Sequence, residues 1–98
     1  MQKDINVTDV IFRKYLDGTI IALLPHECND RHGNVSSYQH IGQHSGADYN
    51  GVIMCTKLAK ETEYFDLKKE MESLGYNLNI IKKQNRVKFL KSLKQSNL

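Results

Sequence analysis

The sequence lacks any apolar run long enough to cross a membrane. Its longest run, Thr19 to Leu24, is far short of the roughly 20 apolar residues that a membrane-spanning helix needs. The N-terminus has no basic segment followed by an apolar one, as a secretion signal would. From these absences we expect a cytoplasmic protein that does not enter a membrane.

Cysteine and proline are also scarce. The two cysteines, Cys28 and Cys55, form a lone pair in a chain without an export signal, and we expect both to be free thiols. Pro25 is the only proline, and no stretch has the composition of a linker or shows an internal repeat. Because 98 residues leave room for one modest core, we expect a single domain.

What the sequence does have is an ordinary globular composition and an uneven distribution of charge. Apolar residues make up 40% of the chain and charged residues 26%, which predicts a folded protein. Residues 82–98 contain cations and no acid, whereas the rest of the chain is mildly acidic. We interpret residues 1–81 as a single domain and residues 82–98 as a basic tail, partly helical or disordered.

The clearest local pattern is a β-hairpin near the N-terminus. Two β-prone runs, Val10–Leu16 and Thr19–Leu24, flank Asp17-Gly18, a dipeptide typical of two-residue hairpin turns. The second run is apolar throughout, so we expect it to be the central strand. The first run contains Arg13 and Lys14, which we interpret as protection of a more exposed strand against edge pairing.

Beyond the hairpin, the strand signals are shorter. Proline cannot donate a hydrogen bond to a β-ladder, so we expect the second strand to end at Pro25 and a polar loop to follow. Three later runs have the composition of short strands. In chain order we predict a loop over His26–Asn34 and strands over Val35–Gln43, Val52–Thr56 and Leu78–Ile81.

Helical periodicity occurs between Glu61 and Gly75. Thr62 can cap the helix at its start, and Gly75 can end it. Four residues form one stripe that we expect to be buried. They are Tyr64, Leu67, Met71 and Leu74. Together the elements predict an α+β domain, a small antiparallel sheet of four to five strands with one helix packed on one face, plus the basic C-terminal tail.

All four histidines and one of the two cysteines fall within one short window. They supply enough nitrogen and sulfur for a tetrahedral zinc site, but the paired cysteines typical of such sites are missing. The cysteine or a histidine could also serve catalysis, yet no complete set of nucleophile, base and stabilising group is evident. The candidate metal ligands are His26, Cys28, His32, His40 and His44.

The segment from Ser37 to Asp48, which begins within this window, is rich in amides, hydroxyls and small residues. Its side chains donate and accept hydrogen bonds, its tyrosines offer ring faces, and Gly42 and Gly46 let a ligand approach the backbone. Such a segment fits a nucleobase, a nucleotide or a peptide; the alternative is a polar edge strand that faces water. The predicted ligand-binding residues are Tyr38, Gln39, His40, Gln43, His44, Ser45 and Tyr49.

The cations of the tail have two interpretations. They could attract nucleic-acid phosphates in a salt-dependent way, or they could belong to a solvated terminus. The candidate nucleic-acid-binding residues are Lys82, Lys83, Arg86, Lys88 and Lys91.

Three sequence blocks between Val10 and Ile81 follow one another in a specific order and spacing. They are Phe12-Arg13-Lys14 with Asp17-Gly18 and Ile21–Pro25, then Ser37–His44, then Glu63-Tyr64 with Leu67, Leu74 and Gly75-Tyr76. In these blocks the chain resembles a family of small uncharacterised proteins from bacteria, phages and mobile elements. The resemblance implies a bacterial or phage cytoplasm and an accessory role, and it carries over no activity or catalytic residue.

We therefore expect a small non-enzymatic binding module that takes nucleic acid or a nucleotide through the Tyr38–His44 segment. Two alternatives stay open. One is a zinc-binding or other metal-binding protein that uses the His26–His44 cluster. The other is a protein-interaction or structural subunit that binds a protein partner or forms a homo-oligomer. No cofactor is implied by the residues.

Overall fold

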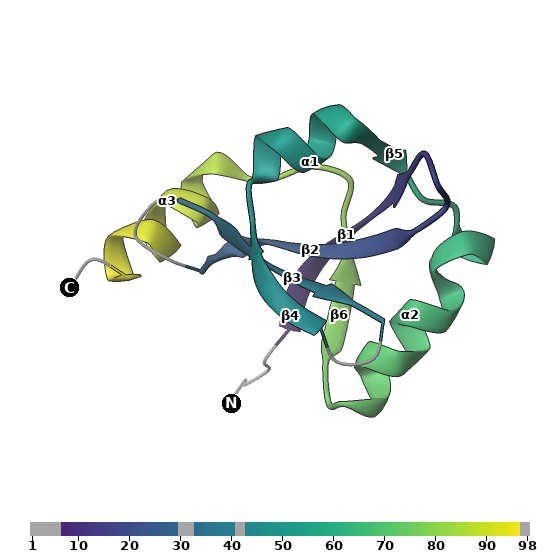
Figure 1. The fold of residues 1–98 in the computed structure, drawn as a ribbon. Helices are drawn as coiled ribbons and strands as arrows, with labels where there is room; N and C mark the ends of the chain where they lie inside the picture. The colour runs from purple at the N-terminus through teal and green to yellow at the C-terminus, as the bar shows by residue number, and fades with distance from the viewer. Residues whose placement is uncertain (1–6, 30–32, 41–42, 97–98) are drawn as a thin grey trace.

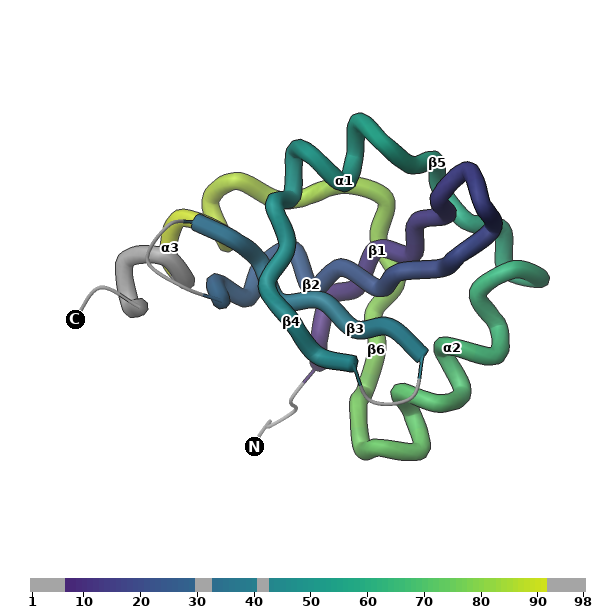
Figure 2. Tube along the Cα trace, viewed as in Figure 1, coloured from purple at the N-terminus to yellow at the C-terminus, as the bar shows by residue number. Residues whose placement is uncertain are grey.

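A computed structural model describes residues 7–29, 33–40 and 43–96, with side chains as far as Lys91. Within this part of the chain there are six strands and three helices (Figures 1 and 2). In chain order they are β1 (Val7–Tyr15), β2 (Ile20–Cys28), β3 (Val35–Gln39), β4 (Gln43–Ala47), α1 (Tyr49–Cys55), β5 (Thr56–Leu58), α2 (Glu61–Ser73), β6 (Asn77–Ile80) and α3 (Arg86–Ser96).

The strands form one sheet in the order β4-β3-β2-β1-β5, and β6 also pairs with β1. All neighbours are antiparallel except β1 and β6, which are parallel. The predicted α+β class is confirmed. The expected four to five strands and single helix are too few, since the described residues form six strands and three helices. Helix α2 covers one face of the sheet, and α1 and α3 cover the other (Figure 1).

Alternation along the strands divides the core into two clusters. Successive side chains of a strand point to opposite faces of a sheet. Val10 and Phe12 of β1 therefore pack toward Leu67 and Met71 of α2, in a cluster with Ala22, Leu24 and Tyr38. The other cluster, on the opposite face, comprises Ile11, Ile21, Leu23, Val35 and Phe89, the last from α3. The basic tail of the sequence is thus tied to the sheet by a buried aromatic ring.

The first hairpin is confirmed, but its turn has three residues instead of two. The N–H of Tyr15 donates to the carbonyl of Thr19 at 2.9 Å, and the N–H of Gly18 donates to the carbonyl of Tyr15 at 2.9 Å. Gly18 has a φ of +92°. This geometry is a tight turn followed by a left-handed glycine, which lengthens the loop to Leu16, Asp17 and Gly18.

β1 is an inner strand of the sheet, although the sequence analysis expected it to be the more exposed strand of the first hairpin. Its backbone pairs with β2 on one side and with β5 and β6 on the other. Arg13 is only 9% exposed and donates to the hydroxyl of Thr56 at 2.9 Å and to the carbonyls of Thr56 and Ile53 at 2.7 and 3.1 Å. Lys14 forms an ion pair with Glu63 of α2. Both cations hold other elements in place, so their predicted role at an exposed edge is wrong.

β2 continues through Pro25 to Cys28, so the predicted end of this strand and part of the predicted loop are wrong. The pairing with β3 shifts from Leu24 opposite Ser36 to Cys28 opposite Val35. Pro25 lies within this irregular stretch, where its missing N–H costs no ladder hydrogen bond. Its carbonyl accepts a hydrogen bond from the side chain of Gln84 at 2.9 Å.

Two predicted strands have a different structure. Most of Val52–Thr56 belongs to the end of α1. In the helix, the apolar side chains of Val52 and Ile53 pack against the core cluster that contains Phe89. Of the predicted strand Val35–Gln43, residues Val35–Gln39 do form β3, whereas Gln43 begins β4, which runs antiparallel so that Val35 faces Ala47 and Gln39 faces Gln43. A short apolar run fits a helix or a strand equally well, and only its surroundings decide.

α2 agrees closely with its prediction. Its end is a glycine-terminated cap, because Gly75 has a φ of +102° and Tyr76 donates its N–H to the carbonyl of Met71 at 3.1 Å. Lys60, not Thr62, is the residue that precedes the first turn. Leu67 and Met71 are buried as expected, but Leu74 is 56% exposed, because the chain turns away from the sheet there.

No helix in the described part of the chain is both long enough and apolar enough to cross a membrane.

Replacing Arg13 tests its role at the end of α1. Arg13→Ala should lower the free energy of unfolding by about 3 kcal/mol, because it removes a buried guanidinium that donates to the carbonyls of Ile53 and Thr56. Arg13→Lys should recover little, since an ammonium lacks the planar fork. Urea unfolding followed by circular dichroism measures both, with Lys57→Ala on exposed β5 as the control. Equal losses for Arg13→Ala and Lys57→Ala would contradict the role.

Candidate functional site

A cavity of about 420 Å³ lies between the turn of the β3–β4 hairpin and α2. Three of the predicted ligand-binding residues line it, namely Gln39, His40 and Gln43. The remaining lining residues come from the first hairpin and from α2; they are Thr19, Ile20, Glu63, Asp66 and Leu67. Gly42, predicted to let a ligand approach the backbone, lies outside the described residues, as does Ile41.

Tyr38 and His40 are joined through a carboxylate of α2. The phenol of Tyr38, whose side chain is fully buried, donates to one oxygen of Glu70. The ring Nδ1 of His40 lies 2.6 Å from the other oxygen of Glu70. Since the side chain of His40 is 77% exposed, Glu70 holds an accessible imidazole at the rim of the cavity. The sequence predicted that Tyr38 offers its ring face to a ligand, but Tyr38 is a core residue whose ring is fully buried, so it cannot do so.

His44 belongs to a neighbouring polar cluster outside the cavity lining. Its Nε2 lies 2.9 Å from the hydroxyl of Tyr76, and its ring meets the ring of Tyr38 edge-on, with centroids 4.7 Å apart. Burial raises the pKa of the nearby Glu27 carboxyl, and attraction by His44 opposes that effect. Burial and the charge of Glu27 both raise the pKa of Tyr76.

Ser45 and Tyr49 lie away from the cavity. The hydroxyl of Ser45 is 3.2 Å from that of Ser37, whose hydroxyl also donates to the carbonyl of Ser45 at 3.0 Å. Tyr49 is on α1, and its hydroxyl accepts a hydrogen bond from the N–H of Gln84 at 2.9 Å. The structure therefore brings together three of the seven predicted ligand-binding residues around one cavity.

Carboxylates of α2 complete the cavity, and the sequence analysis missed them. Asp66 is exposed, while Glu63 is paired with Lys14. The hydrogen bond from Lys14 lowers the pKa of Glu63, and that from the backbone of Lys60 adds to the effect. These acids lie outside the apolar stripe of α2, and nothing in the sequence indicated that their part of the helix meets the hairpin.

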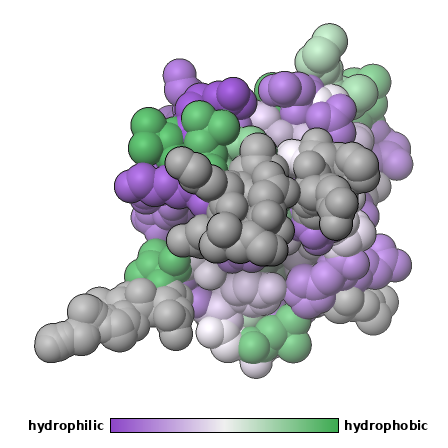
Figure 3. Space-filling model, turned by 90° about the vertical axis from the view of Figure 1, so that its left-hand side faces the viewer, coloured by the Kyte–Doolittle hydropathy of each residue, from purple (hydrophilic) through white to green (hydrophobic). Residues whose placement is uncertain are grey.

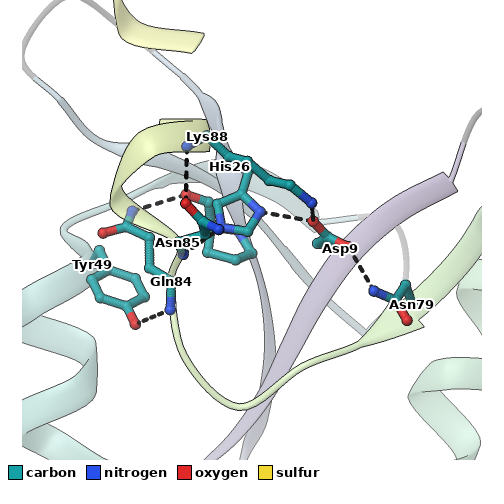
Figure 4. A network of polar contacts seen from close by, with 8 residues as sticks. Asp9, His26, Tyr49, Asn79, Gln84, Asn85 and Lys88 are labelled. Atoms are coloured by element: carbon teal, nitrogen blue, oxygen red, sulfur yellow. Dashed lines mark hydrogen bonds and ion pairs between the residues drawn. The ribbon is translucent and has the colours of Figure 1, made fainter. Parts of the chain in front are cut away.

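His26 lies in a separate polar network on the other face of the sheet (Figure 4). Its Nε2 accepts a hydrogen bond from the backbone N–H of Asn85 at 2.6 Å, so its Nδ1 carries the proton and donates to Asp9 at 2.8 Å. Asp9 also accepts from Asn79 at 2.8 Å and from Lys88 at 3.2 Å. Burial alone would raise the pKa of Asp9, but the hydrogen bonds from Asn79, His26 and Lys88 outweigh it and lower that pKa.

This network fixes the start of α3. Asn85 precedes the helix, and its side chain accepts from the backbone N–H of Lys88 at 3.2 Å, as a helix cap does. Gln84 is held by Tyr49 and Pro25, and Phe89 is buried against the sheet. Both ring nitrogens of His26 serve this attachment, so His26 contributes to structure and not to a ligand site.

The predicted nucleic-acid-binding residues are exposed on and before α3. Lys88 is partly committed to Asp9, and the side chains of the other four are exposed. They are Lys82, Lys83, Arg86 and Lys91. Figure 3 views the molecule from the side on which α3 lies and shows polar surface broken by separate apolar patches. Among exposed apolar side chains, Val87 and Leu90 belong to this helix.

The predicted metal ligands are dispersed. Among the described residues, no group of three or more histidine, cysteine, aspartate or glutamate side chains is arranged to hold a metal ion. His26 binds Asp9, whereas His40 binds Glu70 on the opposite side of the sheet. His32 lies outside the described residues. Cys28 and Cys55 are not joined in a disulfide, as predicted.

No protein-family model, curated protein or solved structure matches this chain.

Removing the charge of Asp9 tests the network that fixes α3. Asp9→Asn should lower the free energy of unfolding at pH 7 by about 1–3 kcal/mol, because charge-assisted hydrogen bonds are lost. The pKa of Asp9 is lowered below the ordinary value of an aspartate carboxyl, so its contribution is present above about pH 4 and disappears as the pH falls through the native pKa.

Urea unfolding at a series of pH values measures this effect. Between about pH 5 and pH 2, the stability of the wild type should fall more steeply than that of Asp9→Asn. Asp66→Asn, which removes an exposed carboxylate of α2, is the control and should leave the wild-type slope in place. Parallel acid slopes for wild type and Asp9→Asn would show that Asp9 is not the titrating group.

Proposed function

We propose that this protein is a small non-enzymatic binding module that holds a nucleobase in the cavity between the β3–β4 hairpin and α2. The base is carried by a nucleoside or by single-stranded nucleic acid. The lining of the cavity carries the proposal: two glutamine amides and an imidazole from the hairpin face two carboxylates from the helix. A volume of about 420 Å³ lies within the usual range for small-molecule sites.

The polar groups of the lining suit the edge of a base. A glutamine amide donates and accepts at once, which matches adenine, and a carboxylate accepts from the amino group of cytosine. Bases of single strands are read on such edges because they are not already paired. Ile20 and Leu67 supply apolar surface for the ring face. Gln39, Gln43 and Asp66 are therefore the expected recognition residues.

The same lining disfavours phosphate. Glu63 and Asp66 bring negative charge to the cavity, and Lys14 is already engaged by Glu63. A phosphate group would meet like charge at close range, with a cost that falls as salt increases. Affinity should therefore depend on the base, and a nucleoside triphosphate should bind no more tightly than its nucleoside.

The support for binding over catalysis comes from what surrounds the imidazole. Glu70 fixes the ring of His40 while leaving most of it exposed, which lowers the entropic cost of ligand binding. Among the described lining residues the one hydroxyl belongs to Thr19 of the first hairpin, and neither cysteine nor serine is present. An accessory role in a phage or mobile element, implied by the family resemblance, is compatible with such a module.

A titration with nucleosides tests the proposal. The four ribonucleosides, added to isotope-labelled protein at millimolar concentration, should shift the amide resonances of Gln39, His40 and Gln43 for at least one base. Isothermal titration calorimetry should give a similar Kd for that nucleoside and its triphosphate. Gln43→Ala and Asp66→Asn should each weaken binding about tenfold, as expected when a base edge loses one hydrogen bond.

Asn50→Ala, on the exposed side of α1, is the matched control and should leave the Kd unchanged. Absence of resonance shifts with every nucleoside would contradict the proposal. A triphosphate that binds in the cavity far more tightly than its nucleoside would also contradict it.

A second function, contact with nucleic-acid phosphates, is favoured by the four exposed cations beside α3. Phe89 and the Asp9 network hold the start of this helix against the sheet, so the cations are displayed from a fixed support. Exposed lysine and arginine on one element are the usual electrostatic footprint of a polyanion contact. We propose that Lys82, Lys83, Arg86 and Lys91 contact the backbone of single-stranded nucleic acid.

Salt dependence tests this contact. Fluorescence anisotropy with a single-stranded oligonucleotide should give a slope of log K against log salt of about −3, as four neutralised phosphates imply. The double variant Lys83→Glu/Arg86→Glu should reduce affinity and make the slope shallower. Lys57→Glu/Lys69→Glu changes the net charge equally on β5 and α2 and serves as the control. Equal losses for the two double variants would show that net charge alone governs binding.

A further inference from the structure

β4 is an outer strand of the sheet. It pairs with β3 along all five of its residues, from Val35 opposite Ala47 to Gln39 opposite Gln43, without a bulge. Within the described part of the chain, no strand pairs with its other side. The outward N–H and carbonyl groups of an outer strand are a template for another strand.

The two sides of the sheet differ in how their outer strands are guarded. Natural proteins protect such edges with very short strands, charged side chains, prolines or bulges. β5, at the other end of the strand order, has three residues, and its middle residue is Lys57. β4 has five residues, pairs in regular register and contains no lysine, arginine, carboxylate or proline. It therefore lacks the protection that β5 has.

The sequence of β4 is compatible with antiparallel pairing to β4 of a second copy of the chain. If two β4 strands lie antiparallel about a two-fold axis at Ser45, Gln43 faces Ala47 of the other copy and His44 faces Gly46. Ser45 then faces Ser45. No like charges meet in this register at neutral pH, whereas a lysine at the axis would face itself. The two-fold arrangement is also closed, so it yields a dimer and not a fibre.

We propose that β4 pairs with β4 of a second copy, so that two sheets join into one across a two-fold axis at Ser45. The inference goes beyond the proposed function and does not depend on it, because the backbone of β4 carries the pairing and the cavity lies at the hairpin turn. The occupant is a second copy because the uncharged strand is self-complementary in the register described above.

Sedimentation velocity over a range of protein concentrations tests the proposal. The wild type should be in monomer–dimer equilibrium, and Ser45→Lys should be monomeric, because two ammonium groups would face each other across the axis. Asn50→Lys adds the same charge to an exposed position of α1 and should dimerise like the wild type. Circular dichroism checks that both variants are folded. A wild type that stays monomeric at every concentration would overturn the inference.

A cross-linking variant keeps the test decisive if Ser45→Lys fails to fold. In a Cys28→Ser, Cys55→Ser background, Ser45→Cys should form a covalent dimer on mild oxidation, because directly opposed strand residues lie within disulfide distance. Asn50→Cys in the same background should not. Equal cross-linking of both variants, or none from Ser45→Cys, would place the interface elsewhere or exclude it.

Discussion

The backbone of β1, paired along both sides, organises this domain. One side meets β2, and the other is divided between β6 near its start and β5 near its end. The alternation of its side chains gives each face of the sheet its anchor points. Val10 and Phe12 support α2, while Asp9 and Arg13, on the opposite face, hold α3 and α1. The apolar side chains on one face of β1 and the polar side chains on the other thus determine where the helices attach.

The candidate site is a consequence of that arrangement. α2 is fixed by buried contacts, including the stacking of Tyr64 on Phe12 with ring centroids 4.3 Å apart. The phenol of Tyr38 on β3 donates to Glu70, which ties the second hairpin to the helix. The walls of the cavity are held by the core, whereas its rim carries exposed hydrogen-bonding groups. A rigid support beneath an exposed polar rim favours binding, since little order has to be gained when a ligand arrives.

The sequence predicted the elements whose causes are local. The first hairpin follows from two β-prone runs and a glycine at a left-handed position, and α2 follows from its apolar stripe and Gly75. It failed at α1, because the apolar residues Val52 and Ile53 fit a strand or a helix equally well. The helix is held by a long-range contact, in which the guanidinium of Arg13 on β1 donates to the carbonyl of Ile53. The sequence also failed at β4, whose side chains are mostly exposed, so its sequence does not alternate between apolar and polar residues.

The histidine window shows the same division between local and long-range causes. Closeness in the sequence predicted one shared site, but His26 meets the start of α3, while His40 and His44 meet α2 and the residue that follows its cap. The sequence by itself determined which segments could be strands or helices and which side chains could form hydrogen bonds. Only the tertiary structure decided which of those side chains meet, because their partners lie up to 79 residues away and are set by packing across the sheet.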